Sequence, residues 1–462
     1  MKYRVRLKTR EKEIIYVICT FAIGVFFFFL LGEGGTIIEK DSYTYISWSY
    51  LPYRKGYTLY PWFLKLIRFI HGEEKYIIYI YIYQGLLSIV SNLLLIEYIR
   101  KRYNISYFVS IIMHILILAT YSYTLPYAVS SHYLMTEGIS FPLFIVSVFF
   151  FLRCIIEHSS SCFYGTVLMC VLIFLTRPHM IVFIFIYVVS AIVFIVFQKI
   201  EKEKHYMLFS ILVFVAIFMS MIGVYGYFRM ISRWNNSMNN SQLLQATSGK
   251  ALCLLKEEDA KYYSGETLEI YRELYYDCKR NGRLISDFPK SVLDYETVHR
   301  IVNKNITSHE DVIRFFFSQK RGDDGGIEVF KERNQIISTE IMNNKKEYIG
   351  IILRLLPSSL VASIFIQPFK YRFFCYIFAT IMYIASLLLL LYSIKKQIDI
   401  EYSFPLSVIM GCIIANAVFC NVLLYGQQRY VVYCIGLFYI FNLVLIKEII
   451  SNRHQKYTIN PD

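Results

Sequence analysis

The groups that could do chemistry in this chain stand at the ends of long apolar runs. Asp41 follows the first run, two residues after Glu39. Ionised groups near membrane depth are costly and are usually functional. An acid held at the bilayer surface could serve as a general base. The alternative is a helix N-cap, because Asp41 or Ser42 precedes a helical pattern.

Two cations follow in the same polar segment. Arg54 and Lys55 stand shortly before Tyr60 and Pro61. The pair could hold a phosphate group, with Pro61 opening a short helix. Arg54 and Lys55 could equally be solvated loop residues without a ligand.

A third polar group, Thr176-Arg177-Pro178-His179, lies in the middle of a long apolar stretch. Proline breaks a helix, so it divides the stretch into two spans. The fork of Arg177, flanked by His179, would then be available to a phosphate at the turn. The alternative is an arginine that extends from a helix end toward water.

The last polar group precedes the final apolar run and contains Gln428, Arg429 and Tyr430. A cation at this position requires an anionic ligand or a structural acid. Glu137, at the start of another apolar run, could be that acid. Glu137 could also simply be a favourable acid in the first turn of a helix.

The composition shows what kind of scaffold must position these groups. Of 462 residues, 56% are hydrophobic and only 18% are charged, and the mean hydropathy is +0.45. A soluble globular protein has about 25% charged residues. These values exclude an ordinary cytosolic enzyme and a disordered chain, and they predict an all-α polytopic membrane protein.

Roughly twenty apolar residues span a bilayer as a helix, and the chain has about ten such stretches. We place them at 13–32, 76–99, 105–122, 138–156, 162–176, 178–198, 206–228, 370–394, 404–424 and 429–449. Basic residues flank alternate ends, which predicts a multi-pass protein of the cytoplasmic membrane with both termini in the cytoplasm. Segment 349–368 contains Arg354 and Pro357, and we interpret it as an interfacial or re-entrant helix on the outer side.

The spans divide the chain into three parts. Residues 1–228 form an N-terminal membrane module, whose first outer loop, 33–75, contains short helices near 43–51 and 60–70. Residues 229–346 form a mostly helical extracytoplasmic domain, and residues 347–462 form a C-terminal membrane module. The middle segment has 19 of the 48 basic and 17 of the 34 acidic residues. Most of the surplus of +14 therefore lies in loops beside the spans, which argues against a nucleic-acid partner.

The cysteines do not have the spacing of a zinc site. Cys253 and Cys278 are the only two in the 229–346 segment. An oxidising compartment favours a disulfide between them, and the alternative is two free thiols too far apart to bond.

Taken in order, these groups form a series along the membrane portion: an acid after the first span, Arg54 before Tyr60-Pro61, Glu137, Thr176-Arg177-Pro178, and Arg429-Tyr430. The series resembles the GT-C superfamily of polytopic glycosyltransferases, in particular relatives of protein O-mannosyltransferases and of the aminoarabinose transferase that acts on lipid A.

The resemblance implies an inverting transfer of a sugar from a polyprenyl-phosphate donor to an extracytoplasmic acceptor, which is a cell-envelope glycan, lipid or protein. Asp41 corresponds to the first catalytic acid of that family, and Ser42 replaces the second, which leaves a divalent metal open. By position, Arg177 and Arg429 would bind the donor phosphate. The bilayer is the remaining partner.

Two other classes are compatible with this sequence. A transporter or flippase would also have about ten spans, although repeated halves or paired broken helices are not evident. A cell-envelope polysaccharide polymerase or ligase of another membrane fold would also use polyprenyl-linked sugars. The sequence does not specify the sugar, the acceptor, the metal dependence or the oligomeric state.

Overall fold

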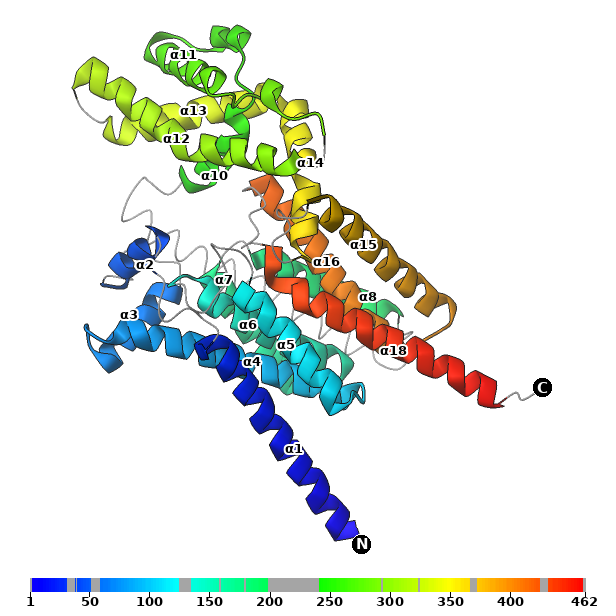
Figure 1. Ribbon diagram of the computed structural model, residues 1–462. Coiled ribbons are helices and arrows are strands. Elements are labelled where there is room, and N and C mark those ends of the chain that lie inside the picture. Colours follow the sequence, from blue (N-terminus) through cyan, green and yellow to red (C-terminus); the bar gives the residue numbers. More distant parts are fainter. Residues whose placement is uncertain are drawn as a thin grey trace.

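A bundle of apolar helices and a smaller helical domain make up the protein (Figure 1). The computed structural model describes residues 2–30, 38, 40–50, 59–123, 134–157, 159–177, 180–197, 241–291, 294–322, 325–365, 372–423 and 431–459. Within these residues all regular structure is helical and there is no strand, in agreement with the all-α prediction. We call the end of the bundle that carries the smaller domain its outer end.

Six helices are long and apolar enough to cross a membrane, and their apolar spans are Glu11–Phe29, Tyr76–Arg102, Glu137–Ile156, Phe373–Lys395, Ile400–Val422 and Val432–Asn452. They belong to α1 (Lys2–Val25, continued by a π-helix at Phe26–Leu30), α4 (Tyr76–Arg102), α6 (Glu137–Ile156), α15 (Arg372–Lys395), α16 (Ile400–Leu423), and η8 (Val432–Cys434) with α18 (Ile435–Ile459). Three further helices, α5 (Tyr107–Tyr123), α7 (Ser160–Thr176) and α8 (Ile181–Phe197), contain shorter apolar stretches. The protein is therefore an all-α membrane protein.

The six apolar spans fall where the hydropathy pattern places them, within a few residues, although α1 begins earlier, at Lys2, and α18 extends further, to Ile459. The proposed span at 206–228 lies outside the described residues. The total of ten spans, and the sidedness of the two termini, accordingly stay predictions.

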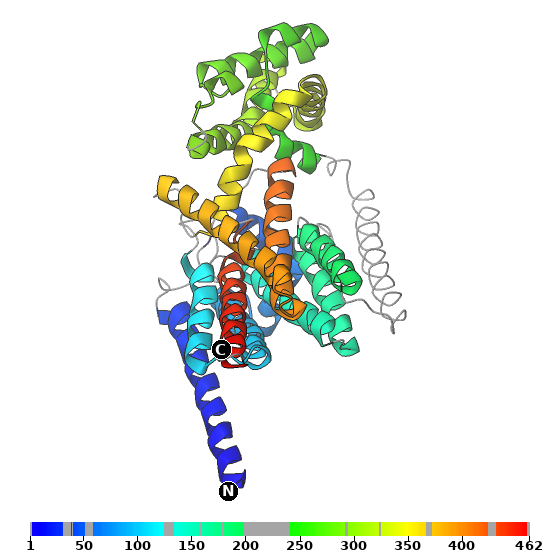
Figure 2. The same cartoon turned by 90° about the vertical axis from the view of Figure 1, so that its right-hand side faces the viewer.

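Polar contacts join the helices at the end of the bundle opposite the outer end. The Lys447 ammonium of α18 donates to the carbonyls of Tyr103 and Asn104 at 2.7 Å each. Arg102 at the end of α4 pairs with Glu401 of α16. The start of α1 and the end of α18 lie on this side of the bundle, away from the smaller domain (Figures 1 and 2).

Two short helices lie against the bundle near its outer end, α2 (Lys40–Tyr50) and α3 (Leu59–His71). They correspond to the helices expected near 43–51 and 60–70. α3 is amphipathic: it buries Tyr60, Leu64 and Ile67, whereas Trp62 and Phe69 are exposed. Such a helix suits a membrane interface.

Arg68 attaches α2 to α3 and α4. Its guanidinium donates to Ser49 Oγ at 2.7 Å and lies over the Tyr50 and Tyr76 rings, 3.9 and 4.6 Å from their centroids. Glu73 completes the surroundings with an ion pair at 3.3 Å. Cation–π contacts from a largely desolvated arginine are stabilising, so α2 is fixed by more than its loop connections.

The smaller domain, which we call the outer domain, consists of α10 (Ser241–Leu252), η5 (Glu257–Tyr262), α11 (Gly265–Arg280), η6 (Ile285–Asp287), α12 (Tyr295–Arg321) and α13 (Gly326–Asn343). Its core includes Tyr271, Leu274, Phe317 and Ile336. α14 (Lys345–Ala362) then leads back from this domain to the bundle (Figures 1 and 2).

α14 packs on α16, and Asn421 Nδ2 donates to Ser359 Oγ across that contact at 2.8 Å. The helix continues through Pro357 and covers most of segment 349–368. Its expected interfacial or re-entrant position stays a prediction.

The disulfide that the oxidising compartment favours is absent: Cys253 and Cys278 are both free thiols. The side chain of Asn305 lies between them. Its Nδ2 donates to Cys253 Sγ at 3.3 Å, and Cys278 Sγ donates to its Oδ1 at 3.6 Å. Spacing along the chain suggested a bond, but a buried amide from α12 occupies the space between the two sulfur atoms.

A buried acid network fastens the outer domain to the start of α14. Glu340 is fully buried and accepts from Tyr263 at 2.8 Å and from Asn344 at 3.2 Å. Asn344 also donates to Asp259 at 3.3 Å. Burial raises the pKa of Glu340 to about 7, so the folded domain retains a proton that the unfolded chain releases near pH 4.5.

This shift makes the stability of the outer domain depend on pH. Between about pH 4.5 and 7 the folded state binds more protons than the unfolded state, so stability falls as pH rises through that window. We expect Glu340→Gln to remove most of this dependence and to stabilise the protein at pH 8. Thermal unfolding of the full-length wild type and of Glu340→Gln at pH 5 and pH 8 measures this pH dependence. An equal pH dependence in the two proteins would contradict the role of Glu340.

Candidate functional site

Buried polar side chains from five elements meet at the outer end of the bundle. Glu137 is the first residue of α6 and is only 3% exposed. Thr136, just before the helix, donates to its Oε2 at 3.0 Å. A carboxylate in the first turn is favoured by the helix dipole, but its burial requires a positive partner.

Arg177 is that partner. It ends α7 in an extended conformation (φ −144°, ψ 96°), which the following Pro178 favours because proline disfavours a helical residue before it. Arg177 Nη1 lies 2.8 Å from Glu137 Oε1, and the two side chains are 7% and 3% exposed. The Thr-Arg-Pro turn and the acid at the start of α6 therefore form one ion pair, whereas the sequence alone suggested Arg429 as a partner for Glu137.

Tyr433 completes the surroundings of this arginine. Arg177 Nη1 donates to the Tyr433 hydroxyl at 3.0 Å, and that hydroxyl is 2.9 Å from Ser140 Oγ of α6. The ring stacks on Phe141, with centroids 4.9 Å apart. Sequence reasoning selected Tyr430 and missed Tyr433, which is enclosed in an apolar run without a flanking polar residue.

Tyr60 extends the cluster to the interfacial helix α3. Its hydroxyl donates to Gln84 Oε1 of α4 at 2.9 Å. Burial raises the pKa of Tyr60 well above its ordinary value, and Tyr45 and Glu137 raise it further. The hydroxyl is therefore a proton donor in hydrogen bonds at physiological pH.

Gly138 of α6 allows Gln84 of α4 to pack closely against α6. A Cβ atom there would lie 2.3 Å from the Gln84 side chain, which is far inside van der Waals contact. Gln84, like Tyr433, was not selected from the sequence. A glutamine in an apolar helix next to Gly85 was the available signal, since polar residues inside membrane spans are rare.

Asp41 is the second residue of α2, but its side chain lies outside the described residues. Further along α2, the Tyr45 ring contacts the Tyr60 ring edge-on, at 5.4 Å between centroids. This contact packs α2 against α3.

The remaining predicted site residues lie outside the described residues, so the structure does not place them: Glu39, Arg54, Lys55, His179, Gln428, Arg429 and Tyr430. Within the described part of the chain, no group of three or more His, Cys, Asp or Glu side chains could hold a metal ion. The question of a divalent metal thus stays open.

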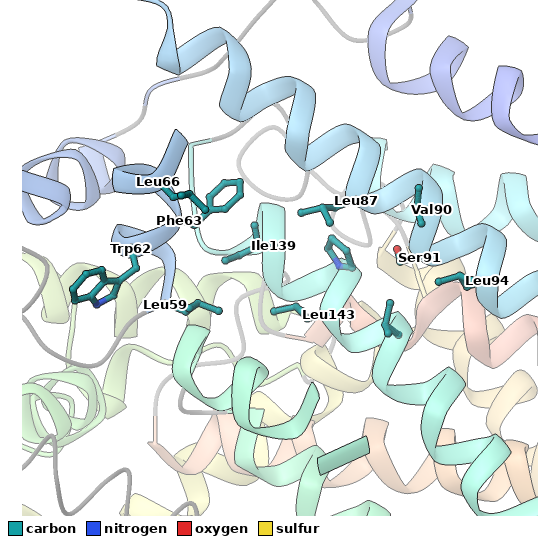
Figure 3. Close-up of a pocket in the computed structure, with 12 residues that line it drawn as sticks. Leu59, Trp62, Phe63, Leu66, Leu87, Val90, Ser91, Leu94, Ile139 and Leu143 are labelled. Carbon is teal, nitrogen blue, oxygen red and sulfur yellow. The ribbon is translucent and has the colours of Figure 1, made fainter. Parts of the chain in front are cut away.

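An apolar pocket of about 350 Å³ is lined by α3, α4 and α6 (Figure 3). Its lining consists of Leu59, Trp62, Phe63, Leu66, Leu87, Val90, Ser91, Leu94, Ile139, Pro142, Leu143 and Val146. Leu59 adjoins Tyr60, and Ile139 is two residues after Glu137. The pocket and the polar cluster therefore share the helices α3 and α6, and Val146 is the lining residue of α6 farthest along the helix from Glu137.

No family model, curated protein or solved structure matches this chain. A function must therefore be inferred from the residues and the geometry of the site.

The buried ion pair is testable by its energetics. Removing one partner of such a pair costs about 3–5 kcal/mol because the other charge is left buried. We expect Glu137→Gln to destabilise the protein by this amount, and Arg177→Met in the same chain to recover part of the loss. Thermal or denaturant unfolding of the purified full chain measures both effects.

The matched control is Glu157→Gln, which breaks the half-exposed Arg153–Glu157 pair. Exposed pairs contribute about 1 kcal/mol or less. If Glu137→Gln were as mild as Glu157→Gln, the carboxylate would not be the partner that holds Arg177.

Proposed function

We propose that the protein is a membrane glycosyltransferase that moves a sugar from a polyprenyl-phosphate donor to an acceptor at the outer face. The observations that support this proposal are the apolar pocket lined by α3, α4 and α6 (Figure 3) and the buried Arg177, which pairs with the first residue of α6. A molecule with a long apolar chain and an anionic head fits that combination.

The pocket is open to the lipid on one side. Trp62, Leu66, Leu87, Val90 and Leu94 line it and are also exposed on the protein surface. Within a bilayer these side chains would face lipid chains, so a lipid could enter sideways without leaving the membrane. Apolar lining supplies affinity for the chain, roughly in proportion to the area removed from water.

The polar cluster would receive the phosphate at the end of that chain. Arginine binds phosphate through two parallel hydrogen bonds. Glu137 and Tyr433 both contact Nη1 of Arg177, so they fix the plane in which the guanidinium presents its donors. We therefore assign Glu137 and Tyr433 as positioning residues for Arg177, whichever sugar is transferred.

Asp41 is the proposed general base. The acceptor hydroxyl attacks the anomeric carbon, Asp41 takes the proton, and the bond from that carbon to the phosphate oxygen breaks with inversion. The departing polyprenyl phosphate carries the electron pair, and Arg177 stabilises the developing negative charge. This step requires a base and a cation on opposite sides of the sugar, which α2 and α7 could provide.

The base assignment can be tested with Asp41→Asn, since asparagine caps a helix as well as aspartate does. We expect turnover to fall by about 10²–10⁴-fold, with expression and donor binding retained. Transfer from a radiolabelled polyprenyl-phosphate sugar in membrane vesicles measures turnover. Glu39→Gln is the control: normal turnover in Asp41→Asn and collapse in Glu39→Gln would move the base two residues upstream.

The proposed binding of the polyprenyl chain in the pocket can be tested by filling the pocket with a larger side chain. Leu143→Trp should raise the KM for a long-chain donor about tenfold or more, because the added ring occupies the space of the chain. A donor with a single isoprene unit should be used equally well by both proteins. Leu388→Trp, on an exposed face of α15, is the control, and equal loss for long and short donors in Leu143→Trp would contradict a chain-binding role.

A further inference from the structure

The helix α14 connects the core of the outer domain with the core of the bundle (Figures 1 and 2). Tyr348, Ile351 and Leu355 share one hydrophobic cluster with Val302 of α12. Val361, in the last turn of α14, belongs instead to the cluster that fills the bundle. One continuous helix therefore leaves the outer domain and enters the apolar part of the protein.

Contacts with two spanning helices show how far α14 enters the bundle. The hydroxyl of Tyr348 donates to the carbonyl of Val422 at 3.5 Å, and Val422 ends the apolar span of α16. The carbonyl of Leu360 accepts from the hydroxyl of Tyr383 on α15 at 2.9 Å. Tyr383 lies well inside the apolar span Phe373–Lys395. α14 therefore passes the outer end of the spans between Tyr348 and Leu360.

The side of α14 opposite its packed face is apolar and exposed. Ile349 and Leu353 are 54% and 60% exposed, and Leu360 follows on the same side of the helix, two turns after Leu353. α14 contacts α15, which contains the least buried of the six apolar spans. Because α14 crosses the outer end of the spans here, the bilayer is the partner that covers its exposed apolar side.

Basic side chains border this apolar side. Lys346 is one turn before the first exposed aliphatic residue, and Arg354 is next to the second; both are exposed. With Lys345, they give α14 three basic residues against one acid, Glu347, whose carboxylate pairs with Lys256 of the outer domain at 3.7 Å. An exposed apolar stripe bordered by cations is typical of a helix at the surface of an anionic membrane.

We propose that this side of α14 binds anionic phospholipids at the membrane surface. Ile349 and Leu353 lie among the acyl chains, and Lys346 and Arg354 bind head-group phosphates. Lysine and arginine extend their apolar stems along such a surface while the charged ends reach the head groups, where phosphate oxygens accept charge-assisted hydrogen bonds. The bound lipid holds the helix that joins the outer domain to the bundle. This inference goes beyond the proposed function, because it involves neither the sugar donor nor the transfer step.

The lipid contact is tested by photo-cross-linking of the full-length protein, with p-benzoylphenylalanine in place of Leu353. The nanodiscs contain phosphatidylcholine and a smaller share of phosphatidylglycerol. We expect this probe to cross-link phospholipid, identified by mass spectrometry. The same probe in place of Tyr276, which is 48% exposed on α11 at the far end of the outer domain (Figure 1), should cross-link none. Failure of the probe at position 353 to capture lipid, or its capture of protein instead, would overturn the proposal.

The role of the cations is tested by the head groups of the captured lipid. Phosphatidylglycerol should be enriched about fivefold over its share in the nanodisc, which is the effect of one basic residue near an anionic surface. Lys346→Gln combined with Arg354→Gln should remove the enrichment, while capture of phosphatidylcholine persists.

The matched control is Lys279→Gln combined with Arg280→Gln, which removes the same two charge types from exposed positions of α11. This variant should retain the enrichment. Equal enrichment in the two double variants, or no enrichment before any charge is removed, would refute a head-group site at Lys346 and Arg354. Either result leaves the proposed function untouched, since these measurements do not depend on transfer.

Discussion

The ion pair between Glu137 and Arg177 sets the arrangement of the outer end of the bundle. A charge buried at this depth is tolerated only with a partner in good geometry, so the start of α6 and the end of α7 must stay together. Tyr433 and Ser140 bind the same pair of elements to η8. These contacts fix α6, the end of α7 and η8 relative to one another, and α6 also supplies Ile139, Pro142, Leu143 and Val146 to the lining of the apolar pocket.

The same constraint reaches the first outer loop. Tyr60 donates to Gln84, and Gly138 lets Gln84 pack directly beside Glu137. Arg68 holds α2 on α3 through Ser49 and Tyr50. The contacts of Arg68 thus hold α2, whose second residue is Asp41, on α3.

The sequence correctly predicted those elements that local patterns determine. Apolar length located the helices, and Pro178 located the turn that presents Arg177, because both signals act over a few residues. Tyr433 and Gln84 were missed because their importance comes from contacts between helices distant in the chain. The disulfide between Cys253 and Cys278 was wrong for the same reason, since Asn305 enters from a third helix. The span count and the roles of Asp41 and Arg429 stay predictions.

The two ends of the bundle differ in how they are held. At the inner end, Lys447 and the Arg102–Glu401 pair join α4, α16 and α18 through side chains that remain near water. At the outer end the Glu137–Arg177 pair is almost completely buried, and single hydrogen bonds from Tyr433 and Tyr60 surround it. Removing one partner of a buried pair costs several kcal/mol, whereas exposed pairs contribute about 1 kcal/mol or less. Single substitutions at the outer end should therefore destabilise the protein more than those at the opposite end.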